Sequence, residues 1–217
     1  MSFQLVNSNV VIAAQQFNPS VMSQLWLVDN NIFQRDEFEP GGMFTEMIVQ
    51  ATSPEFVFFV TPQQLQFTPR GAEEQQQDII VERLGRLVET LPHTPYHAVG
   101  LNFIWYFDPG EIGVRTFSRR LFFAERSALY RAFDVEDARF GGYLSKDSLG
   151  ARLKLDVKPI TVTGEQSCER MQFMFNFNLD VKGEPNPAHS VVELLTRWHE
   201  AYQESARIME TVGGIHE

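Results

Sequence analysis

The most regular pattern of hydrophobic and polar positions in the chain is the stretch Met171–Val181, MQFMFNFNLDV. Apolar residues occupy every odd-numbered position, and Gln, Met, Asn, Asn and Asp occupy the even-numbered ones. Because successive side chains of a β-strand point to opposite faces, this alternation predicts a strand with one buried face. The run His97–Phe107 alternates in the same way and predicts a second long strand.

Further apolar or alternating runs predict the remaining strands, which are Asn9–Phe17, Met43–Ala51, Glu55–Val60, Phe140–Leu144 and Arg152–Val162. The turn Thr52-Ser53-Pro54 suits a hairpin between the second and third of these. The last two are expected to form an antiparallel meander with Arg170–Val181. Gln63–Thr68 is either a continuation of the hairpin or a short extra strand.

The first two expected helices follow the first strand and the hairpin. Asn18-Pro19-Ser20 suits a helix start, with Asn18 as the cap and Pro19 at the first position, and predicts a helix over Ser20–Asp29. Apolar residues at helical spacing predict a second helix over Glu73–Leu91, which Pro92 ends.

Two more helices are expected in the second half of the chain. Phe117–Phe133 contains LFF, which is compatible with a strand, but the looser spacing of its apolar residues favours a helix over much of the segment. A long amphipathic helix is expected over Ala188–Val212, with Gly213 as its C-cap.

Hairpins interleaved with helices predict an α+β fold, with a largely antiparallel sheet and helices mainly on one face. The order strand, helix, strand, strand occurs twice. It suggests two βαββ-type units plus a C-terminal strand and long helix. A chain of 217 residues suits a single domain, 1–217, in which the two units would form lobes 8–91 and 97–212.

Composition narrows the range of partners. A formal net charge of −10 argues against nonspecific binding to nucleic acid or to an anionic membrane. The charge is uneven: residues 1–78 hold two basic and nine acidic residues, whereas residues 115–158 hold ten basic and six acidic ones. This asymmetry would help two copies or two partners to meet, although a solvated surface of mixed sign is the simpler explanation.

The single cysteine, Cys168, excludes an intramolecular disulfide and a cysteine-cluster metal site. It is expected to lie in a turn over Gly164–Glu169. No basic residue precedes Arg35, so the N-terminus lacks the charged region of a secretory signal, and the apolar runs are too short to span a bilayer. We therefore expect a cytoplasmic protein.

The histidines carry no clear metal signature. His93 and His97 are four residues apart, but Pro92 and Pro95 forbid a regular helix there and no third ligand is near in sequence. His189 and His199 are too far apart along a helix to share an ion.

Other candidate groups have simpler structural explanations. Gly141 and Gly142 lack the spacing of a phosphate-binding loop, and glycines within a strand more often mark a bulge or a close approach by another backbone. The acidic cluster of Asp134, Glu136 and Asp137 suits a solvated loop. We predict no catalytic residue, no metal ligand and no cofactor. The sequence favours a protein without enzymatic activity.

Three segments carry a resemblance: the NPS after the first strand, HTPYHAVGLNF (His93–Phe103) and DARFGGYLSKDSLGARLKLDVKP (Asp137–Pro159). Through these the chain resembles a family of uncharacterised bacterial α+β proteins over roughly residues 8–212. The resemblance implies a βαββ-type layout and a closing long helix. The family has no assigned activity, so no residue role follows from it.

The second faces of the two best strands are the most informative feature for function. Their residues are neither fully polar nor fully apolar, whereas an open sheet face normally carries more charge. They are Asn102, Ile104 and Tyr106 on one strand and Met174, Asn176 and Asn178 on the other. A helix of the same chain, a second protomer or another protein, or a small ligand would each explain such a face.

Two hypotheses for function follow. The first is a non-catalytic cytoplasmic protein that works by association, through self-assembly or as a subunit of a larger complex. The second is a small-ligand-binding sensor with a groove between the βαββ units. An enzyme whose site converges from scattered residues is a third, weaker alternative.

Overall fold

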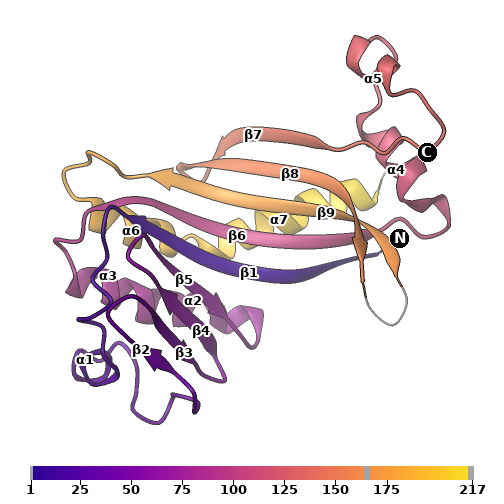
Figure 1. Cartoon of the computed structure of the whole chain (residues 1–217). Coiled ribbons are helices and arrows are strands. Elements are labelled where there is room, and N and C mark those ends of the chain that lie inside the picture. Colours follow the sequence, from indigo (N-terminus) through magenta and orange to yellow (C-terminus); the bar gives the residue numbers. More distant parts are fainter. Residues whose placement is uncertain (1, 164–166, 215–217) are drawn as a thin grey trace.

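The computed structural model describes residues 2–163 and 167–214 and is built around one antiparallel sheet of nine strands (Figure 1). The strand order is β2-β3-β4-β5-β1-β6-β9-β8-β7. The strands are β1 Ser2–Ala14, β2 Met43–Phe44, β3 Val49–Thr52, β4 Phe56–Val60, β5 Gln64–Pro69, β6 Tyr96–Asp108, β7 Gly142–Ser148, β8 Ala151–Val162 and β9 Cys168–Asp180.

The helical segments follow β1, β5, β6 and β9 along the chain. They are α1 Gln24–Asp29, α2 Glu73–Ile80, the π-helical turn η1 Val81–Gly85, α3 Arg86–Thr90, the 3-10 turn η2 Gly110–Ile112, α4 Gly113–Phe122, α5 Ala128–Ala132, α6 Pro187–Leu195 and α7 Trp198–Gly213. The α+β class with a largely antiparallel sheet is therefore confirmed. No helix among the described residues is both long and apolar enough to cross a membrane.

The order of elements repeats between the two halves, as the sequence suggested. Each half begins with a long strand, continues through helix and a meander, and ends in helix; the meander has four strands, β2–β5, in the first half and three, β7–β9, in the second. The opening strands β1 and β6 pair at the centre of the sheet, and each also pairs with the last strand of its own meander, β5 or β9. β9 thus belongs to the second unit, so the prediction of an additional strand after that unit is corrected.

The core lies on one face of the sheet, between the strands and the helices. In β6, Phe103 contacts Trp198 of α7 with ring centroids 4.7 Å apart, and Phe107 stacks on Phe117 of α4 at 4.6 Å. In the first half, Phe33 stacks on Phe56 of β4 at 4.6 Å. Alternation of buried and half-buried residues along β6 and β9 follows the predicted pattern. Figure 1 views the sheet from its other face, with α6 and α7 behind it.

The sequence pattern predicts the first strand over Asn9–Phe17, but β1 runs over Ser2–Ala14. Helix starts and breaks also differ from the sequence predictions. Asn18 does not cap a helix, because its side chain accepts a hydrogen bond from Ser20 in a turn; α1 begins later, with Ser23 as the cap that accepts from the amide of Trp26. The predicted helix over Ala188–Val212 is broken into α6 and α7 at Thr196, whose hydroxyl donates back to the carbonyl of Glu193.

Three other boundaries are corrected. The segment Phe117–Phe133 contains two short helices, α4 and α5, instead of one. Gly213 is the last residue of α7 and not its cap. Residues 164–166 of the predicted turn lie outside the described residues, and Cys168 begins β9. Gln63–Thr68 corresponds to a separate strand, β5, which resolves one alternative that the sequence left open.

Candidate binding surface

The six residues that the sequence pattern singled out lie together on the face of the sheet opposite to α6 and α7. We call this side the open face. Pairing of β6 with β9 places Asn102 opposite Asn176 and Ile104 opposite Met174. Tyr106 and Asn178 lie on the same face, opposite Gln172 and Gly100. All six are half-buried. The structure therefore brings into one surface what the sequence predicted on two separate strands.

A chain of side-chain amides crosses the middle of the open face. Asn176 Nδ2 donates to Asn102 Oδ1 over 2.6 Å, and Asn102 Nδ2 donates to Asn9 Oδ1 over 2.9 Å. The register makes this chain continuous, because Asn102 is opposite both Asn9 on β1 and Asn176 on β9. Each amide is held by its neighbour, so the three side chains form an ordered polar strip across three strands.

Gly100 makes room for this strip. A Cβ atom at this position would lie 2.8 Å from Nδ2 of Asn176, closer than non-bonded atoms approach. The Asn176 amide therefore lies directly over the backbone of Gly100, which is buried beneath it. Glycine within a strand commonly marks such a close approach.

The open face is uncharged over the middle of its three central long strands, whereas Asp108 at the end of β6 and Arg170 near the start of β9, 3.0 Å apart, face the same side. Between their ends, the open-face positions of these strands are Gln4, Asn7, Asn9, Val11 and Ala13 on β1, Ala98, Gly100, Asn102, Ile104 and Tyr106 on β6, and Gln172, Met174, Asn176 and Asn178 on β9. On the neighbouring β8, Arg152, Lys154 and Lys158 face the same side as Asp156. A neutral surface thus adjoins a charged one.

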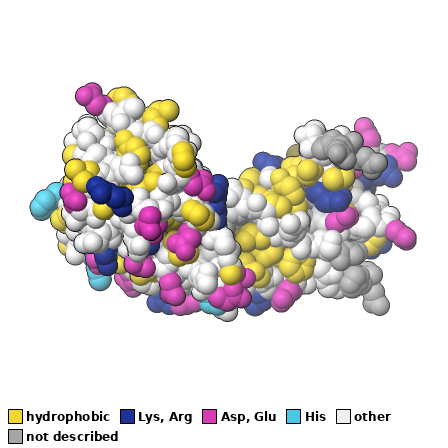
Figure 2. Space-filling model, turned by 90° about the horizontal axis from the view of Figure 1, so that it is seen from below, with side chains coloured by type: hydrophobic (Ala, Val, Ile, Leu, Met, Phe, Trp, Pro, Cys, Tyr) yellow, Lys and Arg dark blue, Asp and Glu magenta, His cyan; other side chains and the backbone are white. Residues whose placement is uncertain are grey.

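The same face continues into the first half of the sheet. A hollow of about 340 Å³ is lined there by Val57 and Phe59 of β4 together with Gln50, Gln66 and Thr68. The register places it on the open face, since Gln66 is opposite both Val11 of β1 and Phe59. Figure 2 looks from below onto the lower edge of the sheet and shows the molecule narrowing between a bulky part and an arm, with hydrophobic side chains on the arm beside the narrowing.

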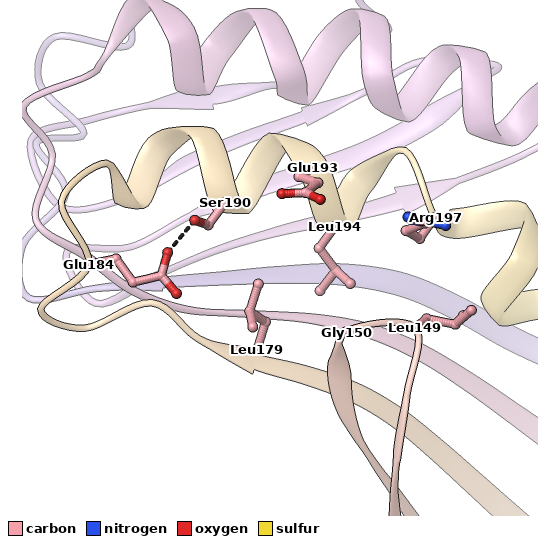
Figure 3. A pocket seen from close by; sticks show the side chains of 8 residues that line it. All are labelled: Leu149, Gly150, Leu179, Glu184, Ser190, Glu193, Leu194 and Arg197. Atoms are coloured by element: carbon pink, nitrogen blue, oxygen red, sulfur yellow. Dashed lines mark hydrogen bonds between the residues drawn. The ribbon is translucent and has the colours of Figure 1, made fainter.

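A separate cavity of about 370 Å³ lies between α6, the end of β9 and the turn from β7 to β8 (Figure 3). Its walls are formed by three leucines and by charged residues of α6 and the preceding loop, namely Leu149, Gly150, Leu179, Glu184, Ser190, Glu193, Leu194 and Arg197. The Ser190 hydroxyl donates to the Glu184 carboxylate, which fixes that side chain at the rim. All of these elements belong to the second unit, so this cavity is not a groove between the two units.

The histidines are dispersed. His97 lies on β6, and its Nε2 is buried without a hydrogen-bond partner among the described residues. His199 Nδ1 lies 3.8 Å from the Glu73 carboxylate, and His189 is on a different helix, α6. Within residues 2–163 and 167–214, no three His, Cys, Asp or Glu side chains are placed to hold a metal ion together.

The remaining sequence candidates have structural roles. Asp134 pairs with Arg119, and Glu136 lies 3.6 Å from Arg115, so two of the clustered acids attach their loop to α4. At Gly141 a Cβ atom would lie only 2.4 Å from the carbonyl oxygen of Val157. The close backbone approach predicted for this glycine is thereby confirmed.

Two aromatic side chains anchor α7 on the core face. Trp105 Nε1 donates to Ser205 Oγ over 3.1 Å. Tyr202 packs against Trp105, and burial together with a hydrogen bond to Glu73 raises the pKa of its hydroxyl to about 12. That hydroxyl stays protonated at neutral pH and is a poor general base, so these residues bind sheet and helix together.

Asn9, Gln66 and Phe59 belong to the open face but were not singled out by the sequence. Their own strands are short or begin in polar residues, so alternation within each strand gave a weak signal. The register of β1 against β5 and β6 was the missing information.

Neither a scan against protein-family models nor a search of curated proteins found a match to this chain.

Proposed function

We propose that this protein is a non-catalytic association protein, and that the open face binds a second copy of the same chain. The observation that carries the proposal is the neutral, half-apolar surface over β1, β6 and β9, on which no helix of the described chain packs. The cytoplasm is the compartment proposed for it, since a chain with one cysteine needs no oxidising environment for internal disulfides.

The size of the open face supports this proposal. The long strands β1, β6 and β9 have 13 residues each and β8 has 12. At about 3.3 Å per residue and about 4.8 Å between strands, the three neutral strands present roughly 600 Å², and the charged β8 brings the area to roughly 800 Å², which is about what each partner of a stable specific complex contributes. The ordered amide strip lowers the entropy cost of binding, because its side chains are already fixed.

The charge distribution favours a second copy over an unrelated partner. Residues 1–78, with two basic and nine acidic residues, carry a net charge of −7 and form β2–β5 with α1 and the start of α2. Residues 115–158, with ten basic and six acidic residues, carry +4 and include α5 and β7 at the opposite end of the molecule in Figure 1. A two-fold axis through the middle of the open face would bring each acidic end towards the basic end of the other copy.

The test is the mass of the protein in solution, measured by size-exclusion chromatography with light scattering over a concentration series. We expect a species of twice 24.9 kDa that dissociates on dilution. Ile104→Lys and Met174→Lys place a charge at half-exposed positions in the centre of the face and should increase the dissociation constant at least about 10-fold each.

Leu129→Lys is the matched control, because Leu129 is 65% exposed on α5 and lies away from the open face. It should leave the mass unchanged. A strict monomer at every concentration would refute the proposal, and so would equal effects of all three substitutions. Raising the salt concentration should weaken the dimer if the two charged ends contribute.

A second function, the binding of a small ligand, is favoured by the cavity of Figure 3. Glu184 and Glu193 suit an amine, and Leu179 and Leu194 provide an apolar surface. Arg197, which pairs with Glu200 at 3.0 Å, would exchange that partner for the carboxylate of a ligand. The ligand class that matches this set is a small zwitterion with an apolar side chain.

A thermal-shift screen of apolar amino acids tests this alternative. Binding at 100 times the dissociation constant would stabilise the protein by about 2.7 kcal/mol, which is readily measured. Glu184→Gln should remove the shift, whereas Glu136→Gln, on an exposed loop outside the cavity, should not. An unchanged melting temperature across the set would exclude these ligands.

A further inference from the structure

The first half of β1 leaves one edge of its backbone without a partner strand. On one side, β1 pairs with β6 along nearly its whole length, from Ser2 to Ala14. On the other side, its pairing with β5 covers only Val10–Ala13. We call Ser2–Ser8 the free edge. No backbone hydrogen bond of the described chain fills it, so alternate N–H and C=O groups of this segment point away from the sheet.

The free edge lacks two of the usual protections of an edge strand, charged side chains and proline. Natural proteins commonly block exposed edges with charged side chains, above all lysine, or with proline. Ser2–Ser8, SFQLVNS, contains neither. The outer strand β7 is protected by contrast, since Lys146 and Asp147 lie in its centre. The free edge is therefore the better acceptor for an additional strand.

The side chains along the free edge are partly apolar and exposed. Phe3 is 36% exposed and Val6 is 40% exposed. Phe3 and Leu5 face the core side of the sheet, whereas Gln4 and Asn7 face the open side. In Figure 2 the view from below looks towards β1, the lowest long strand of Figure 1, and hydrophobic side chains lie on the arm beside the narrowing there. A strand added here would meet apolar neighbours on one face and amides on the other.

A bulge limits how this edge is used. The register of β1 against β6 shifts between Leu5 and Asn7, so Val6 is an extra residue on β1. Bulges bend a strand and increase its twist, which disfavours long flat pairing between many copies. The edge thus suits one short strand better than an extended sheet.

We propose that the free edge of β1 binds an extended peptide segment of another protein by β-strand addition. The segment would alternate apolar with uncharged polar residues, and main-chain hydrogen bonds would supply much of the affinity. This site adjoins the open face, to which Gln4 and Asn7 also belong, but it uses the backbone edge of β1 instead of the side chains of the sheet face. The two proposals therefore stand or fall separately, and together they would let a dimer recruit a third chain.

The test uses the full-length protein and a capped heptapeptide of alternating valine and threonine with lysine at both ends. Backbone amide hydrogen exchange is followed residue by residue. With peptide at about 10 times its dissociation constant, exchange of the outward-pointing amides of Ser2–Ser8 should slow about 10-fold. The same peptide with every interior amide N-methylated keeps its side chains but loses its donors, and should have no effect.

The expected result also includes a loss of protection in Val6→Lys, which places a charge on the free edge at an exposed position. The proposal would be overturned if amide exchange in Ser2–Ser8 did not slow at peptide concentrations up to about 1 mM, which corresponds to a binding free energy weaker than about −4 kcal/mol. Equal slowing with the methylated peptide, or slowing confined to the amides of β7, would also overturn it. The open-face variant Ile104→Lys should still bind the peptide, which separates this test from that of self-association.

Discussion

Asn176 and Asn102 are 74 residues apart in the sequence, yet Nδ2 of Asn176 donates to Oδ1 of Asn102 over 2.6 Å. Asn102 in turn donates to Asn9, so the side-chain amide of Asn102 is both acceptor and donor. Such a linked arrangement is rigid on an otherwise solvent-facing surface, because each side chain has its orientation fixed by the next. Its removal should be felt in stability and in association.

The first prediction concerns this amide strip. Asn102→Ala and Asn176→Ala should each lower the free energy of unfolding by about 1 kcal/mol, the usual net value of one hydrogen bond at a half-buried site. Since both residues share one bond, the double variant should cost less than the sum of the single variants. Urea denaturation of the four proteins measures the coupling. Strict additivity would show that the bond contributes nothing.

The second prediction compares the two faces of β9 at adjacent positions. Phe175→Ala should lower the free energy of unfolding by about 3–5 kcal/mol, because Phe175 is only 1% exposed and its removal leaves a cavity. Met174→Ala, on the open face, should cost about 1 kcal/mol or less, since its side chain is only half-buried. Chemical denaturation distinguishes them. Equal losses would contradict the assignment of core and open face.

The third prediction concerns Arg83, a buried guanidinium in the π-helical turn η1. It pairs with Glu37 and donates to the carbonyl of Ile32, and so ties the loop after α1 to the helix after β5. Arg83→Met should cost about 3–5 kcal/mol, because it leaves the carboxylate of Glu37 poorly solvated without its partner. Arg83→Met combined with Glu37→Gln should recover part of that loss in thermal or urea unfolding.

The fourth prediction is a pH dependence through Glu204. Burial alone would raise the pKa of this carboxyl, but Lys146 and Arg207, both hydrogen-bonded to it, lower the pKa below its usual value. A carboxyl with a lowered pKa in the folded state stabilises the fold above its unfolded pKa, and the stabilisation is lost as the pH falls through the folded pKa. Glu204→Gln should therefore lower the melting temperature at pH 7 by a few degrees, corresponding to about 1 kcal/mol.

The control for this prediction is the acid side of the same titration. Below the folded pKa of Glu204 the wild type has lost the interaction, so the two proteins should melt at similar temperatures there. A difference that stays constant from neutral to acidic pH would attribute the effect to packing instead of charge.

The fifth prediction uses two glycines with opposite surroundings. Gly141→Ala should destabilise the protein by several kcal/mol, because its Cβ would lie 2.4 Å from a backbone oxygen that cannot move freely. Gly85→Ala should stabilise it by about 0.5–1 kcal/mol, since Gly85 has helical backbone angles and its nearest neighbour, Val192, is at an ordinary contact distance. Differential scanning calorimetry measures both.

Alternation along single strands identified β6, β8 and β9, because one-sided burial leaves a period of two in the sequence, but it missed the first seven residues of β1, Ser2–Ser8. Helix starts were less predictable. Asn18 and Ser23 are both good capping residues. In the structure Asn18 lies in a turn and bonds to Ser20, whereas Ser23 caps α1. The break between α6 and α7 depends on the hydroxyl of Thr196 reaching a carbonyl, a local competition that hydrophobic spacing does not reveal.

The sequence alone determined the fold class, the buried faces of β6 and β9, and the six residues of their second faces. These are properties of one segment at a time, set by the side chains it contains. The tertiary structure decided which strands are neighbours, and therefore that Asn9 completes the strip of Asn102 and Asn176 and that Ser2–Ser8 has no partner strand on one side. Register and strand order arise from the packing of the whole core, because pairing between distant segments is fixed by the side chains they bury together.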